Sequence, residues 1–138
     1  MDLTRRSLFL SMSALATTAA FAADNQPLSS FIKPYDQLPA KSDGKNTSRP
    51  ILDGTTHSGD HLEVHETTLG PGGSPHPPHR HEHEEMFLMV KGHLAVTIEG
   101  TTTVMGPGGA AFVHSGELHG VRNPDHEDAQ YFVVAIGV

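Results

Sequence analysis

The chain has 138 residues, enough for one domain, with 9 basic and 16 acidic side chains and a formal net charge of −7. This acidic balance argues against nucleic acid and anionic membrane surfaces as partners, because both bind basic patches. The absence of cysteine excludes disulfides and thiolate ligands, so a bound metal must be held by imidazole nitrogen and by oxygen.

The first residues have the pattern of a removable signal peptide. Arg5 and Arg6 precede an uncharged stretch that ends in Ala-Phe-Ala at residues 20–22, which predicts cleavage after residue 22. A membrane anchor is the weaker alternative, because the apolar run is short and rich in Ala, Ser and Thr. We therefore expect residues 1–22 to be a signal peptide and the mature protein to be free of the membrane.

The paired arginines also resemble a twin-arginine leader, the type that carries folded proteins across the bacterial inner membrane. Leu10 stands where such leaders usually carry lysine, so a general secretory leader is the alternative. Either route predicts a periplasmic or secreted protein. Cleavage would leave 116 residues with 7 basic and 15 acidic side chains, a net charge of −8 that favours solubility.

The mature chain divides into an arm and a domain. Residues 23–52 contain four prolines and a polar stretch, and we expect an extended arm with little regular structure. In residues 53–138, short runs of Val, Ile, Leu, Phe and Thr alternate with turns that carry Gly or Pro. The predicted strands are 62–69, 77–82, 86–91, 94–98, 101–105, 110–114, 119–123 and 129–136. Many short strands without helical periodicity predict an all-β sandwich or closed barrel.

Edge strands favour the barrel over the sandwich. A single barrel pairs its own edges, whereas a sandwich this short would leave them open. With 36% apolar residues and no Trp, the chain has few large side chains for the core of this small domain. Pairing between two copies, with the proline-rich arm crossing over, would bury more surface, and we expect a homodimer.

All eleven histidines lie in the predicted domain, and they are densest just before the strand predicted at 86–91. Residues two apart on a strand point to the same face, so His79 and His81 can aim at one point inside the barrel. Glu85 shares the inward phase of the next strand, and His119 follows a turn much later in the chain. Three imidazoles and one carboxylate suit one divalent ion of Mn, Fe, Co, Ni, Cu or Zn, and they leave positions for water or substrate.

The same residues resemble the cupin family. Each fixed position of the first cupin motif is matched by Gly73-x5-His79-x-His81-x3-Glu85-x6-Gly92. The second motif is similar to Gly108-x5-His114-x-Gly116-x2-His119-x3-Asn123, with His114 where cupins usually carry proline. The resemblance covers about residues 62–136 and implies a double-stranded β-helix, a jelly-roll barrel, with one divalent metal in its lumen. It also implies that the four residues named above are the ligands; a barrel that has lost its metal is the alternative.

Other polar residues near the first motif have alternative roles. His83 and Glu84 are expected in a solvated turn. A shift of the strand register would instead pair His81 with His83 and turn Glu85 to the wrong face. His76 lies between prolines and can reach the barrel mouth.

His65 shares the phase of Leu69 on its predicted strand and can therefore line the pocket. Its spacing from His57 and His61 would suit a metal site on a helix, but the Val- and Thr-rich context disfavours a helix there. Two histidines that follow turns are expected at the surface: His93 and His126.

Fold and metal do not determine the chemistry. One hypothesis is a metal-dependent enzyme, of the dioxygenase, decarboxylase, isomerase or lyase class, that acts on a small oxygenated molecule. Its metal would polarise a carboxylate, carbonyl or enediol, and Glu85 or a nearby imidazole such as His65 would move the proton. The alternative is a non-catalytic periplasmic protein that binds or senses a metal or small ligand. A second protonatable group inside the barrel separates the two, and His65 and His76 favour the enzyme.

Overall fold

The computed structural model describes residues 26–137, so the predicted signal peptide lies outside the described residues. Residues 26–137 form nine strands and one short 3-10 helix, η1 (Tyr35–Gln37). The strands are β1 (Lys41–Ser42), β2 (Asn46–Thr55), β3 (His61–Leu69), β4 (Glu84–Lys91), β5 (Leu94–Ile98), β6 (Thr101–Met105), β7 (Ala110–Val113), β8 (His119–Arg122) and β9 (Ala129–Ile136). In this part of the chain no helix has the length and apolar composition to cross a membrane.

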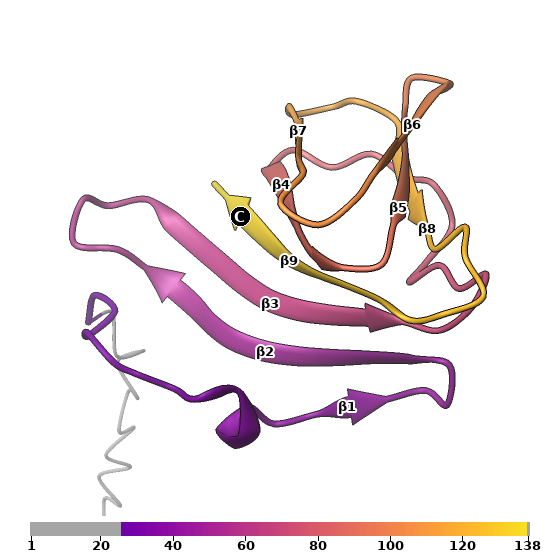
Figure 1. The fold of residues 1–138 in the computed structure, drawn as a ribbon. Coiled ribbons are helices and arrows are strands. Elements are labelled where there is room, and N and C mark those ends of the chain that lie inside the picture. Colours follow the sequence, from indigo (N-terminus) through magenta and orange to yellow (C-terminus); the bar gives the residue numbers. More distant parts are fainter. Residues whose placement is uncertain (1–25, 138) are drawn as a thin grey trace, which may run out of the picture.

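The strands form two antiparallel sheets. The larger has the order β1-β2-β3-β9-β4-β7 and the smaller the order β6-β5-β8. In Figure 1 the long strands β2, β3 and β9 lie side by side, and the strands from β4 to β8 wind above them. Because the last strand, β9, lies between β3 and β4, the chain closes into one jelly roll. The predicted all-β jelly-roll fold is confirmed.

The apolar core comes from alternate residues on the inner faces of the sheets. On β4, Phe87 and Met89 are buried, whereas Leu88 and Val90 are exposed. Glu85 has the inward phase of the buried pair, as predicted. The remaining buried core residues are Leu69, Leu94, Val96, Val113, Val121, Ala129, Tyr131 and Val133.

Two residues at fixed positions of the motifs, Gly92 and Asn123, have structural roles. Gly92 has a φ of 72°, and a Cβ there would lie 2.7 Å from the carbonyl oxygen of Asp128, so glycine lets the β4–β5 turn pass close to β9. Asn123 is fully buried, and its Nδ2 donates to the carbonyl oxygens of Leu69 at 3.0 Å and Glu127 at 2.7 Å. These bonds join the ends of β3 and β8.

Strand β2 begins at Asn46, so the prediction of little regular structure is wrong for residues 46–52. β2 pairs with β3 along its whole length. Pro50 misleads the prediction, because proline lacks an N–H and is unfavourable in a central strand. Here it lies at a register shift, and β1 pairs with β2 only through residues 47–48.

The preceding part of the arm lies against the outer side of the larger sheet. The N–H of Leu28 donates to the carbonyl of Thr55 at 2.8 Å, and the ring of Tyr35 lies 4.8 Å from the guanidinium of Arg49. Arg49 in turn donates to Glu66 at 2.8 Å, and the side chain of Glu66 is completely buried. The arm therefore covers an ion pair on the outer face of the sheet.

Candidate metal centre

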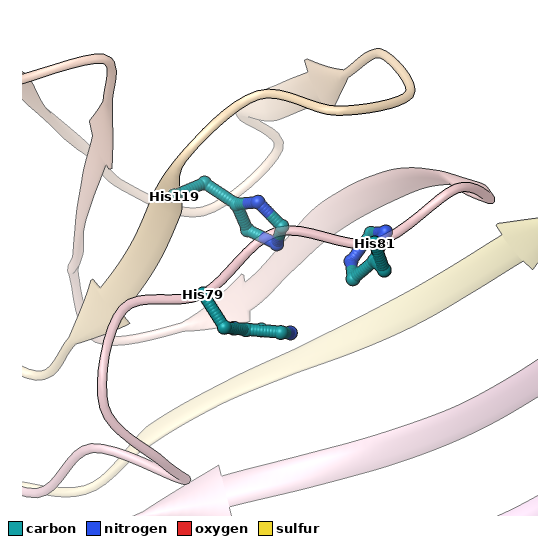
Figure 2. Close-up of side chains that lie close together, drawn as sticks. All are labelled: His79, His81 and His119. Carbon is teal, nitrogen blue, oxygen red and sulfur yellow. The ribbon is translucent and has the colours of Figure 1, made fainter.

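Three histidine rings converge between the loop before β4 and the start of β8. One nitrogen from each of His79, His81 and His119 lies within 4.8 Å of the others. The ring centroids are separated by 5.1 Å, 4.8 Å and 4.7 Å. Figure 2 shows the three side chains pointing toward one another. The structure thus brings together the three imidazoles that the sequence predicts as ligands.

Backbone hydrogen bonds hold the two segments side by side. His79 and His119 exchange N–H···O bonds of 2.9 and 3.0 Å, and the N–H of Gly116 donates to the carbonyl of His81 at 2.9 Å. The strand predicted at 77–82 is wrong, because this proline-rich segment forms one isolated bridge and no ladder. The two histidines of the loop nevertheless point the same way, since both are tied through their backbones to the β8 side.

Glu85, the second residue of β4, points into the same cluster. Its Oε2 lies 3.2 Å from His119 Nε2, and its Oε1 lies 3.4 Å from His81 Nε2. Burial by itself raises the pKa of this carboxyl, but His81, His83 and His119 outweigh burial and hold the pKa of Glu85 below its usual range. The carboxylate is therefore ionised at neutral pH, which is the form that binds metal.

Hydrogen bonds fix which ring nitrogens face the cluster. His81 Nδ1 lies 2.8 Å from the carbonyl oxygen of His83, and His119 Nδ1 lies 3.0 Å from that of Glu117. Because a carbonyl oxygen only accepts, both Nδ1 atoms donate, so in the neutral ring the lone pair that a metal needs is on Nε2. Both Nε2 atoms face the oxygens of Glu85.

Two buried ring nitrogens of the cluster, His79 Nδ1 and His81 Nε2, lack a hydrogen-bond partner among the described residues. When the rings are neutral, their lone pairs repel the carboxylate oxygens, and a cation bound between them would remove that repulsion. Three imidazoles and a carboxylate fit a divalent transition metal, and backbone carbonyls orient two of the rings as they do in metal sites.

His79 is held in its neutral form. Burial lowers its pKa most, and the neighbouring His76, His119 and His81 lower it further. Neutral imidazole is the form that coordinates a metal. The centroid of the His76 ring lies 4.2 Å from that of the His79 ring, and His76 is exposed and lines the cavity, one of the positions that the sequence allows.

The prediction that His83 and Glu84 lie in a solvated turn is wrong. Glu84 is the first residue of β4, and both residues are partly buried. The His83 ring stacks on that of His81 with centroids 3.6 Å apart and planes at 7°, and its Nε2 lies 3.4 Å from Glu85 Oε1. A second group of ligand atoms, from His81, His83 and Glu85, therefore lies within 4.8 Å. The folded loop, rather than sequence spacing, creates this group.

A cavity of about 420 Å³ opens beside the cluster. Glu85 and His119 form part of its wall. Its other lining residues are apolar or uncharged for the most part and include Thr67, Phe87, Val121, Tyr131 and Val133. Burial raises the pKa of the Tyr131 phenol, which is therefore neutral.

Lys41 and His65 also line this cavity. Lys41, Ser48 and Thr67 are successive register partners across β1, β2 and β3, so they share one face of the sheet. Sequence reasoning missed Lys41, because its place depends on the pairing of β1. His65 Nδ1 lies 3.1 Å from Glu63 Oε1 and donates to that carboxylate, which leaves Nε2 as an acceptor.

Other histidines lie outside the cluster. His93 is half-exposed and lies 2.6 Å from a carboxylate oxygen of Asp125, and His126 is exposed, so the predicted surface positions are confirmed. His114 replaces the usual motif proline. Its backbone N–H donates to the Glu117 carboxylate at 3.3 Å, a bond that proline could not make. This hydrogen bond, rather than a proline ring, stabilises the turn before β8.

The comparisons with known proteins agree with this description. The family model for the cupin domain matches residues 65–135. KdgF from a Halomonas species is similar in structure, with a TM-score of 0.69, 17% identity and coverage of 80% of this chain and 96% of its own. The polyketide cyclase RemF from Streptomyces resistomycificus has a TM-score of 0.66, 26% identity and coverage of 80% and 81%.

A predicted oxalate decarboxylase from Thermotoga maritima has a TM-score of 0.63, 18% identity and coverage of 78% of this chain and all of its own. No curated protein matches the chain. The family model covers half of the chain, both motifs occupy the jelly roll, and the His cluster lies at the motif positions. The chain belongs to the cupin family.

Proposed function

We propose that this cupin is an exported, metal-dependent enzyme that acts on a small oxygenated molecule. His79, His81, Glu85 and His119 would hold one divalent ion, and the observation that carries the proposal is the convergence of these ligand atoms beside a cavity, two of them buried without a hydrogen-bond partner among the described residues. When bound there, the ion would act as a Lewis acid toward an oxygen of the substrate. The reaction class is a dioxygenation, decarboxylation, isomerisation or lyase step.

The cavity suits a molecule with an apolar body and polar ends. Phe87, Val121 and Val133 line it and would exclude water from the bound substrate. Lys41 and Asp43 both line the cavity, so it offers a cationic and an anionic group to the polar ends of a substrate. A volume of about 420 Å³ limits the substrate to a small molecule.

His65 is the residue best placed to move a proton. Its Nδ1–H is held by the carboxylate of Glu63, so its Nε2 can accept a proton from a substrate in the cavity. Glu85 is the second candidate acid or base, although its oxygens already face His81 and His119. A proton acceptor separate from the ligand cluster favours an enzyme over a plain binding protein.

Two of the similar structures are named as enzymes, the polyketide cyclase RemF and the predicted oxalate decarboxylase. Their fold supports an enzyme here and leaves the substrate open.

The test begins with protein stripped of metal and reloaded separately with Mn, Fe, Co, Ni, Cu or Zn. Each form is given a panel of small carboxylates, keto acids and enediols, and oxygen uptake and product formation are measured. Turnover by one loaded form is expected. His65→Gln should reduce kcat and keep the metal, whereas His119→Ala should lose both. Metal binding without turnover or uptake would instead identify a binding or sensing protein.

A further inference from the structure

The turn between β5 and β6 contains an unfavourable backbone conformation. Glu99 has a φ of 43° and is the one residue other than glycine with a positive φ among residues 26–137. It forms a two-residue turn with Gly100, whose φ is 82°. Turns of this kind favour Gly, Asn or Asp at the first position, because a larger side chain with positive φ is strained. Some interaction of the Glu99 side chain must offset that strain.

The carboxylate of Glu99 binds two segments at once. Arg80 donates through both of its terminal nitrogens, with Nη2 lying 3.3 Å from Oε2. The backbone N–H of Leu118 donates to Oε1 at 2.7 Å, and the N–H of Glu99 donates back to the carbonyl of Leu118 at 2.8 Å. The bonds from Arg80 and then from Leu118 hold the pKa of Glu99 below its usual range, so it is ionised at neutral pH.

These partners adjoin the ligands of the metal centre. Arg80 lies between His79 and His81, and Leu118 immediately precedes His119. Arg80 also donates to the carbonyl oxygen of Gly116 at 2.6 Å. The Arg80–Glu99 pair therefore connects the loop that carries two ligands to the segment that carries the third. Both side chains are about half exposed and lie outside the ligand cluster.

We propose that Arg80 and Glu99 are positioning residues that set the distance between the two ligand segments before metal binds. This inference rests on the proposed metal site. Without the pair, the loop and the start of β8 would be joined by their backbone bonds alone. Metal binding would then have to order these two segments, which lowers the metal affinity. Because partners that orient ligands affect affinity by about 10–100-fold, the loss of this exposed pair should raise the metal Kd by roughly tenfold.

Glu99→Gly tests the proposal in the full-length mature protein. Glycine accepts the positive φ, so this variant removes the carboxylate and also relieves the backbone. We expect metal-free Glu99→Gly to unfold at the wild-type temperature or above it, and to bind Zn²⁺ and Co²⁺ about tenfold more weakly in competition with a chromogenic chelator. The visible spectrum of the Co²⁺ form should also change, since ligand geometry would differ.

Arg80→Ala should weaken binding at least as much, because it also removes the bond to the carbonyl of Gly116. The losses in the double variant should be less than additive, because the two residues share one contact. Arg80→Lys, which keeps the charge without the two-pronged contact, should recover part of the affinity. Arg122→Ala is the matched control, since Arg122 is an exposed arginine on the same strand as His119. It should leave Kd and spectrum unchanged.

Wild-type Kd and Co²⁺ spectrum in both Glu99→Gly and Arg80→Ala would overturn the positioning role while leaving the metal site intact. Tighter binding in Arg80→Ala would overturn it too, because the arginine would then act by repelling the ion. Failure of the wild-type protein to bind any metal would overturn the proposed function and this inference together.

Discussion

Replacement of His79 by Ala should remove most of the stabilisation that metal gives, whereas replacement of His83 by Ala should leave it intact. These two residues distinguish the two groups of ligand atoms, because His81 is common to both. His79 Nδ1 is buried without a hydrogen-bond partner among the described residues, as expected of a metal ligand in the metal-free protein. His83 keeps 23% of its side chain exposed and lies flat against His81.

Mass action gives the size of the effect. An ion at about 1,000 times its Kd stabilises the folded protein by about 4 kcal/mol. A direct ligand should be worth at least about 100-fold in affinity, since even outer partners are worth about 10–100-fold. The remaining stabilisation is then about 1.4 kcal/mol. At about 4 °C per kcal/mol for a domain of this size, the metal-linked rise in Tm should fall from about 16 °C to about 6 °C.

The assay is thermal unfolding followed by circular dichroism, with and without metal, for wild type, His79→Ala and His83→Ala. His93→Ala serves as the control, because His93 is an exposed histidine outside the cluster. A greater loss in His83→Ala than in His79→Ala would refute the reasoning, since the ion would then be held by the group containing His83. Equal losses would mean that the loop register differs from the one described.

Three further predictions concern the ion pair, pH and export. Arg49→Leu should lower the free energy of unfolding by about 3 kcal/mol, because it leaves a buried carboxylate unpaired at Glu66, and should leave the metal Kd unchanged; an unchanged urea midpoint would contradict this. In the metal-free protein, the lowered pKa values of His79 and Glu85 mean that the unfolded chain binds more protons than the folded one. The contribution of these two groups to the free energy of unfolding should therefore be complete at neutral pH, decrease below about pH 6.5 and decrease again below about pH 4.3. Urea unfolding is the measurement, and a free energy of unfolding that rises toward about pH 5.5 would contradict this expectation. Arg5→Lys with Arg6→Lys should stop export through a twin-arginine route, and cell fractionation that finds normal periplasmic protein with the same metal would identify a general secretory leader.

Most strands of the barrel and the inward phase of Glu85 could be predicted, because both follow from local spacing. Phe87 and Met89 alternate with exposed residues, and the same alternation carries Glu85 inward. His79 and His81 point the same way, as predicted, because backbone bonds tie their loop to the β8 side. Only the reason for their shared direction differs from the prediction.

Features that depend on distant pairing could not be predicted. Lys41 reaches the cavity because β1 pairs with β2, and two strand residues after a polar, proline-rich segment give no periodicity to detect. Glu66 looks like an exposed strand residue until Arg49 and the arm cover it. The stacking of His83 on His81 likewise depends on how the loop folds.

The most direct test of the metal centre is a crystal structure of the metal-loaded protein with anomalous scattering measured at the absorption edge of the ion. We predict one anomalous peak, with nitrogens of His79, His81 and His119 and an oxygen of Glu85 at about 2.0–2.3 Å. A peak bound by His83 in place of His79 and His119 would contradict this account. So would the absence of a peak within the barrel when the crystallised protein still contains metal.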